Sequence, residues 1–217
     1  MTDDTWQFGT LRPQTYRLFT FDPPWKMRMG TGNRPQHYPR MTDEEIAALR
    51  IRDLLHPQGA WVVMWITVPM TERFWLNIYP AYRKAGLRYS SGFTLWIKTH
   101  SVLARAGEPL FIHRSSYHTG QGLTTRKNAE EALLFKFRKP PPRLDKGIRE
   151  LIVSPLREHS RKPEEFYENC EKFCDGPRGE LFGRFQRPGW DVWGNEPEKF
   201  NAGALAAGAD LGIASAK

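Results

Sequence analysis

Short apolar runs alternate along this chain with stretches in which apolar residues recur at helical spacing. Short runs bounded by turn residues are typical of buried strands, whereas apolar positions three and four apart indicate an amphipathic helix. The alternation predicts an α/β fold with a mostly parallel twisted sheet and helices on both faces. The expected strands lie at 16–21, 60–66, 88–98, 130–137, 150–154 and 179–185, and the expected helices at 43–50, 69–85 and 163–174.

Local signals set the helix boundaries. Thr42 and Glu45 form a capping-box pattern, so a short helix should begin at Asp43 and end near residue 50. Pro80 should kink or divide the second helix, because proline lacks an N–H and its ring clashes with the preceding turn. Pro163 suits the first turn of the last helix, whose acidic start matches the helix dipole.

Several stretches show neither the apolar runs of strands nor the helical spacing of apolar residues. Residues 26–40 are rich in Gly, Pro and basic side chains, which predicts a loop directly after the first strand. The polar stretch at 99–127 is too long for an ordinary connection, and KPPPR at 139–143 predicts a stiff linker. We expect one compact domain at 1–200 and a flexible Ala/Gly-rich tail at 201–217.

Composition narrows the class of protein. The chain has 217 residues, of which 40% are hydrophobic and 13% aromatic, enough for one sizeable core. No stretch approaches the roughly 18 to 20 apolar residues of a membrane span, and the first ten residues do not resemble a signal peptide. We therefore expect a cytoplasmic protein. Cys170 and Cys174 exclude a disulfide framework, and we expect them to be buried side chains and not metal ligands.

The positive charge is concentrated in the middle of the chain. The formal net charge is +8, and residues 61–139 contain 12 Lys or Arg residues against 4 Asp or Glu residues. A localised basic surface attracts a polyanion through phosphate contacts and counterion release, so nucleic acid is the expected partner. The alternative is a solvated face that only keeps the protein soluble.

The sequence DPPW follows the first expected strand. The Asp22 carboxylate can accept a hydrogen bond from an exocyclic amino group. Pro23 has no N–H and a rigid ring, which leaves its carbonyl free to accept the second amino hydrogen, and Pro24 completes the turn. Together these acceptors would draw the nitrogen towards tetrahedral geometry and free its lone pair for in-line attack on a methyl donor.

Aromatic side chains can hold a base beside these acceptors. Trp25 offers a flat face for stacking, and Tyr38 and Trp65 are candidates to complete the stack. The base would have to be flipped out of a duplex or already single-stranded. The alternative for DPPW alone is an ordinary turn with a tryptophan packed on the core.

Over residues 16–196 the chain resembles the MT-A70 family of N6-adenine methyltransferases, which includes the catalytic subunit of the eukaryotic messenger-RNA adenosine methyltransferase and many bacterial and phage enzymes. The resemblance implies a Rossmann-like class I fold with the catalytic motif before the cofactor motif. It also implies S-adenosylmethionine as cofactor, S-adenosylhomocysteine as product, and no metal. The motifs are DPPW, HYPRMTDEE (37–45), VVMWIT (62–67), LWIKT (95–99), TRKNAEEALL (125–134), EHSRKPEEFY (158–167), ELFGR (180–184) and GWDVWGNE (189–196).

The resemblance also implies roles for individual residues. Lys162 is the implied partner of the cofactor carboxylate, a role that suits a cation on a flexible stem. The other implied cofactor-binding residues are Asp22, Ser160, Glu180, Phe182, Arg184, Asn195 and Glu196. The residues implied near the base or the cofactor entrance are Lys98, Asn128 and Glu130.

The sequence thus predicts a single methyltransferase domain, monomeric or homodimeric, that methylates adenine N6 in DNA in a bacterial or phage-infected cytosol. DNA is favoured over RNA because the chain resembles compact bacterial and phage enzymes that lack appended RNA-binding domains. The alternatives are an RNA N6-adenine methyltransferase, a cytosine N4 methyltransferase, and a non-catalytic nucleic-acid-binding subunit.

Overall fold

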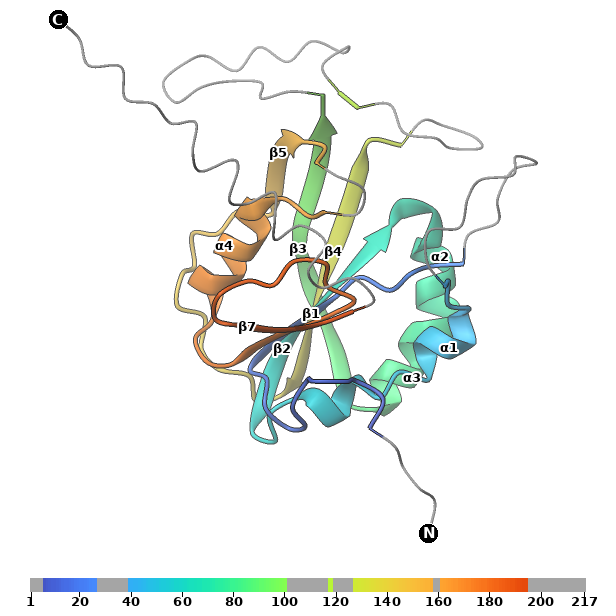
Figure 1. Ribbon diagram of the computed structural model, residues 1–217, viewed down its shortest axis with the longest axis vertical. Helices are drawn as coiled ribbons and strands as arrows, with labels where there is room; N and C mark the ends of the chain where they lie inside the picture. Colours follow the sequence, from blue (N-terminus) through green and yellow to red (C-terminus); the bar gives the residue numbers. More distant parts are fainter. Residues whose placement is uncertain (1–5, 27–38, 101–116, 119–126, 158–160, 195–217) are drawn as a thin grey trace, which may run out of the picture.

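A seven-stranded sheet organises the molecule, with strand order β5-β3-β4-β2-β1-β6-β7 (Figure 1). The computed structural model describes residues 6–26, 39–100, 117–118, 127–157 and 161–194, so the predicted tail at 201–217 and most of the 99–127 stretch lie outside the described residues. The strands are β1 (Leu18–Phe21), β2 (Gly59–Thr67), β3 (Leu87–Thr99), β4 (Ala129–Arg138), β5 (Leu151–Pro155), β6 (Arg178–Leu181) and β7 (Trp190–Trp193).

Helices cover both faces of this sheet, as the sequence pattern predicts (Figure 1). One face carries α1 (Asp43–Ala47), α2 (Thr71–Arg73) and α3 (Tyr79–Lys84), and the other carries α4 (Glu164–Phe173). Short turns η1 (Ile51–Leu54), η2 (Val68–Met70) and η3 (Phe74–Ile78) complete the first layer. Because residues alternate between the faces of a strand, β1 serves two cores, with Phe19 on the α1 and α3 side and Leu18 on the α4 side.

The local signals act much as predicted. The Thr42 hydroxyl caps the Glu45 N–H and the Glu45 carboxylate caps the Thr42 N–H, which confirms the capping box, although α1 ends at Ala47 and not near residue 50. Pro80 lies in the first turn of α3, directly after the π-helical turn η3, so the helix is divided as expected. Pro163 is the residue before α4 and not its first turn.

Strand directions place the ends of most strands at one edge of the sheet. Six of the seven strands run in the same direction as one another, whereas β4 is antiparallel to its neighbours β2 and β3. The carboxyl ends of β1, β3 and β6 therefore share an edge with the amino end of β4. We call this the reaction edge, because ligands of α/β sheets bind beyond the carboxyl ends of strands.

None of the helices in the described ranges has the length and apolar content that a membrane crossing requires.

Candidate active site

The DPPW segment turns away from the sheet at the end of β1. All four β1 residues are buried, and Asp22 follows them at the reaction edge with a side chain that is 28% exposed. The Pro23 carbonyl accepts the Trp25 N–H at 2.9 Å. The prediction of a free Pro23 carbonyl needs correction, since one lone pair is already engaged and one remains.

The exit of the DPPW segment is held by a short parallel bridge. The Met41 N–H donates to the Pro24 carbonyl at 2.8 Å, and the Lys26 N–H donates to the Met41 carbonyl at 2.9 Å. Arg73 donates to the Lys26 carbonyl at 2.9 Å while it also pairs with the buried carboxylate of Asp43. These contacts, which the sequence did not indicate, tie the DPPW segment to α1 and α2.

Lys162 is the centre of a buried charge cluster. Its Nζ lies 2.8 Å from Asp22 Oδ2 and 2.7 Å from Glu130 Oε2, and its side chain is only 7% exposed. Lys98 pairs with the other oxygen of Glu130. Three distant segments thus meet here: the end of β1, the antiparallel β3–β4 pair, and the residue that precedes α4 by two positions.

The cluster keeps its charges in ionised pairs. Burial opposes ionisation of Glu130, but Lys162 and Lys98 together hold its pKa at about 2. Burial raises the pKa of Asp22, reinforced by the Glu130 charge and opposed by Lys162. Although burial disfavours the ammonium, Asp22 and Glu130 raise the pKa of Lys162 above its ordinary value. An isolated buried charge costs several kcal/mol, so each member depends on its partners.

Lys162 and Asp22 each retain capacity for a ligand. A lysine ammonium has three N–H donors, of which two are directed to carboxylates, and the Lys162 Nζ also lies 4.6 Å from the centre of the Trp65 ring. Asp22 Oδ2 is bound to Lys162, while Oδ1 has no hydrogen-bond partner within the described residues. The pair can therefore bind one anionic and one hydrogen-donating group side by side.

A second buried carboxylate lies one strand away. Glu180 on β6 is 7% exposed and accepts a hydrogen bond from the Tyr167 hydroxyl at 2.9 Å. Burial raises the pKa of Glu180 to about 7, which the Tyr167 hydrogen bond opposes and the Asp22 charge reinforces. The sequence analysis did not single out Tyr167. Its position four residues after Pro163, on the apolar face of the predicted helix, could have indicated a buried hydroxyl.

The segment after β6 turns sharply. The predicted strand at 179–185 ends at Leu181, because Phe182 adopts a left-handed backbone with φ 66° and donates its N–H to the Trp193 carbonyl at 2.6 Å. A Cβ at Gly183 would lie 2.4 Å from Val192 Cγ1. Gly183 thus permits close packing of this turn against β7.

The two predicted tryptophans are core side chains in this structure. Trp25 is 5% exposed, and Trp65 is 2% exposed with its ring against Phe166 and Trp96. The Lys162 ammonium lies over the face of the Trp65 ring. Their stacking on a base stays a prediction.

The remaining predicted residues are placed as follows. Asn128 is half-buried, and its carbonyl accepts the Lys98 N–H at 2.8 Å, next to the charge cluster. The charge of Arg184 favours the ionised form of Asp22. The residues that lie outside the described ranges are Tyr38, Ser160, Asn195 and Glu196.

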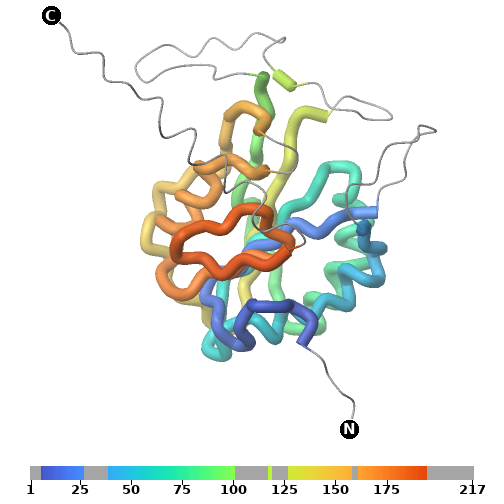
Figure 2. Tube along the Cα trace, in the orientation of Figure 1, coloured from blue at the N-terminus to red at the C-terminus, as the bar shows by residue number. Residues whose placement is uncertain are grey.

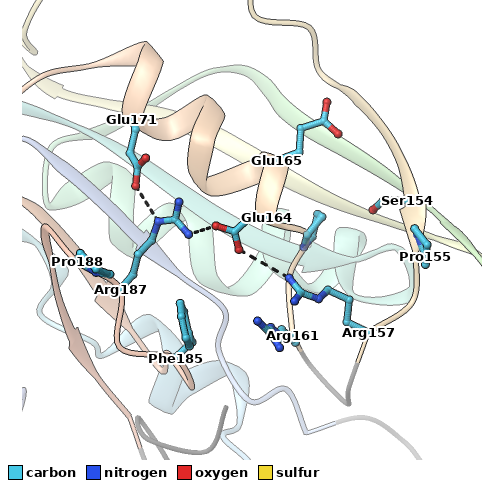
Figure 3. Close-up of a pocket in the computed structure, with 11 residues that line it drawn as sticks. Ser154, Pro155, Arg157, Arg161, Glu164, Glu165, Glu171, Phe185, Arg187 and Pro188 are labelled. Atoms are coloured by element: carbon cyan, nitrogen blue, oxygen red, sulfur yellow. Dashed lines mark hydrogen bonds and ion pairs between the residues drawn. The ribbon is translucent and has the colours of Figure 1, made fainter. Parts of the chain in front are cut away.

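A pocket of about 960 Å³ is lined by residues of α4, of the segment between β5 and α4, and of the segment after β6 (Figure 3). Arg187 crosses it and pairs with Glu164 and, at 2.7 Å, with Glu171. Arg157 approaches Glu164 from the opposite wall at 3.7 Å. Glu164 and Glu171 of α4 are thus paired with arginines of this wall.

The cysteines are buried on α4 and just after it, as predicted. Burial raises the pKa of the Cys170 thiol well above its ordinary value, so this thiol is unreactive. Within the described residues, no group of three or more His, Cys, Asp or Glu side chains is arranged to hold a metal ion.

Comparison with known proteins matches this arrangement to one family. Residues 16–196 match the MT-A70 family model. The chain is 28% identical over 183 residues to the Drosophila melanogaster N(6)-adenosine-methyltransferase MT-A70-like protein, and the alignment covers 81% of this chain and 26% of that protein.

Human relatives are matched to a similar extent. Identity is 28% to the N(6)-adenosine-methyltransferase catalytic subunit METTL3, with 81% of this chain and 27% of that protein covered. Identity is also 28% to the N(6)-adenine-specific methyltransferase METTL4, with 86% and 38% covered. The chain therefore spans about a quarter to two fifths of the length of these relatives. With the family model matched from β1 to the residues after β7, this chain belongs to the MT-A70 family of S-adenosylmethionine-dependent N6-adenine methyltransferases.

Proposed function

We propose that this protein transfers the methyl group of S-adenosylmethionine to the N6 amino group of adenine in DNA, with the target base flipped out or single-stranded. The observation that carries the proposal is the Asp22 carboxylate at the end of β1, bound through one oxygen to Lys162 and with the other oxygen available. A carboxylate fixed in this way is a preorganised acceptor for an amino group.

The substrate amino group needs two acceptors. Asp22 Oδ1 provides one, and the remaining lone pair of the Pro23 carbonyl provides the other. Two hydrogen bonds in this geometry favour a pyramidal nitrogen, whose lone pair is then directed at the methyl carbon. The amino proton becomes acidic after transfer and leaves to solvent or to Asp22, so no separate base is required.

The donor set fits the amino-acid end of S-adenosylmethionine, which when bound supplies an electrophilic sulfonium methyl group. Its carboxylate suits the third N–H of Lys162, and Glu130 keeps Lys162 protonated and in place. Glu180 on the neighbouring strand offers a further acceptor at the reaction edge. Asn195 and Glu196 remain proposed partners of the ribose hydroxyls.

DNA is the proposed polymer, because the sequence resembles compact bacterial and phage enzymes of the family. RNA is the second candidate, since several relatives are named for adenosine, a ribonucleoside, while METTL4 is named for adenine. Monomer and homodimer are both compatible with the proposal, and the bacterial or phage-infected cytosol is its proposed setting.

The test is transfer of labelled methyl from S-adenosylmethionine to adenine-containing DNA and RNA of the same sequence, followed by digestion and identification of the labelled nucleoside. N6-methyldeoxyadenosine is the expected product, and Asp22→Asn is the control that should yield none. Labelled N6-methyladenosine from RNA alone would show that RNA and not DNA is the substrate. Labelled N4-methylcytosine would show that the target base is cytosine. Cofactor binding without transfer to either polymer would support a non-catalytic subunit.

A further inference from the structure

A connection between β4 and β5 carries a concentrated positive charge. Residues 139–149 contain Lys139, Arg143, Lys146 and Arg149 against a single acidic residue, Asp145. All five side chains are exposed.

The structure separates the acidic residues of α4 from the connection. Glu164 and Glu171 are paired with Arg187, and Glu168 lies 3.9 Å from Lys172 within α4. The Asp145 carboxylate accepts the Gly147 N–H at 2.6 Å. Within the described residues, no ion pair joins Lys139, Arg143, Lys146 or Arg149 to a carboxylate, so their charge is not used in folding contacts.

The backbone of the connection is fixed although its side chains are exposed. The Trp61 indole donates to the Pro141 carbonyl at 2.9 Å. The N–H groups of Leu144 and Asp145 donate to the last carbonyls of α4, those of Phe173 and Lys172, at 2.9 and 3.2 Å. A fixed backbone removes the backbone share of the entropy lost when an anion binds, which leaves only the side chains to be ordered.

The connection leads towards the reaction edge. It passes beside α4 and enters β5, the edge strand whose carboxyl end lies level with Thr99 (Figure 2). Beyond β5, Arg157 and Arg161 line the pocket, and Arg161 directly precedes Lys162 in the chain. The five residues of β5 span about 16 Å, the length of about five base pairs.

We propose that residues 139–149 form a phosphate-binding track for the DNA strand that flanks the target adenine, several nucleotides away from it. The track rests on the proposed function for the identity of its ligand. Basic groups near the carboxyl end of α4 also interact favourably with its dipole, but that effect is small and needs no DNA.

The test variant is Arg143→Gln, Lys146→Gln, Arg149→Gln. The matched control is Arg52→Gln, Arg83→Gln, Lys84→Gln, which removes the same charge from exposed side chains of η1 and α3 on the other face. Equal unfolding temperatures establish that both variants are folded. Binding of a labelled single-stranded DNA of about 25 nucleotides with a central adenine, and of a pentanucleotide, is measured by fluorescence anisotropy over a range of salt.

The test variant should bind the long DNA at least about tenfold more weakly at low salt, and its log affinity should depend on log salt with a slope shallower by about 2, since each lost phosphate contact contributes about 0.7. The control should change affinity less than about threefold, and pentanucleotide binding should change in neither variant. Equal losses in both variants, no loss in either, or no DNA binding by the unaltered protein would overturn the track.

Binding of a polyglutamate peptide distinguishes a DNA-binding surface from one that binds an acidic protein. If it binds through the same three residues while long DNA does not, the surface recognises an acidic protein and the track is wrong. The binding readout requires no chemistry. If the protein binds DNA through residues 139–149 but transfers no methyl group, the proposed function is refuted and the phosphate-binding track is not.

Discussion

Glu130 is predicted to stabilise the folded protein through its two lysine partners. The substitution Glu130→Gln keeps the size of the side chain and removes the negative charge between Lys98 and Lys162. Among the carboxylates of the described residues, Lys162 then retains Asp22, and Lys98 loses its buried partner. Breaking a buried ion pair from one side is costly because the remaining charge stays desolvated.

The magnitude follows from the depressed pKa of Glu130. A shift from the ordinary 4.5 to about 2 corresponds to about 3 kcal/mol, and the side chain is only 17% exposed, so solvent screening is small. A carboxylate whose pKa is lower in the folded state stabilises the protein above the unfolded pKa. That contribution is lost as the pH falls from about 4.5 through about 2.

Urea unfolding of both proteins between pH 7 and pH 3 checks this reasoning. At pH 7 the free energy of unfolding of Glu130→Gln should be lower by about 3 kcal/mol, and the difference should narrow steadily below pH 4.5. Glu168→Gln is the control, since its exposed pair with Lys172 is worth less than about 0.5 kcal/mol. A difference below about 1 kcal/mol, unchanged with pH, would refute the low pKa.

Four further predictions concern the site. Asp22→Asn should lower methyl transfer at least about a hundredfold and change DNA binding less than about threefold, so full activity in a labelling assay would exclude its proposed role. Lys162→Met should weaken cofactor binding at least about tenfold, as measured by calorimetry, and unchanged affinity would remove it from the cofactor site. Glu180→Gln should become more stable relative to the unaltered protein, by about 3 kcal/mol, as the pH rises from about 4.5 to about 7, because a raised carboxyl pKa costs stability over that window; parallel pH profiles would contradict this. Gly183→Ala should lose about 1–3 kcal/mol in thermal unfolding, since its Cβ would overlap Val192, and an unchanged transition would mean that the turn relaxes freely.

The sequence by itself determined the elements that depend on nearest neighbours. The capping box at Thr42 and the break at Pro80 involve contacts within a few residues, so local chemistry fixes them. The apolar runs likewise located six of the seven strands, because a short apolar run is typical of a buried strand, but the four-residue strand β7 was missed. The family motifs then indicated Asp22 and Lys162, which the fold brings to within 2.8 Å.

Strand direction and long-range pairing were decided by tertiary structure. An apolar run has the same pattern whether its strand is parallel or antiparallel, so the sequence did not predict that β4 is antiparallel. The direction of β4 places Glu130 at the reaction edge, where it contacts Lys98 and Lys162. The buried state of Trp65 was hidden for the same reason, since packing partners distant in sequence leave no local signal. The charge of residues 139–149 was visible in the sequence. Only the fold distinguished it from the acidic helix beside it, because ion pairs form in space and not along the chain.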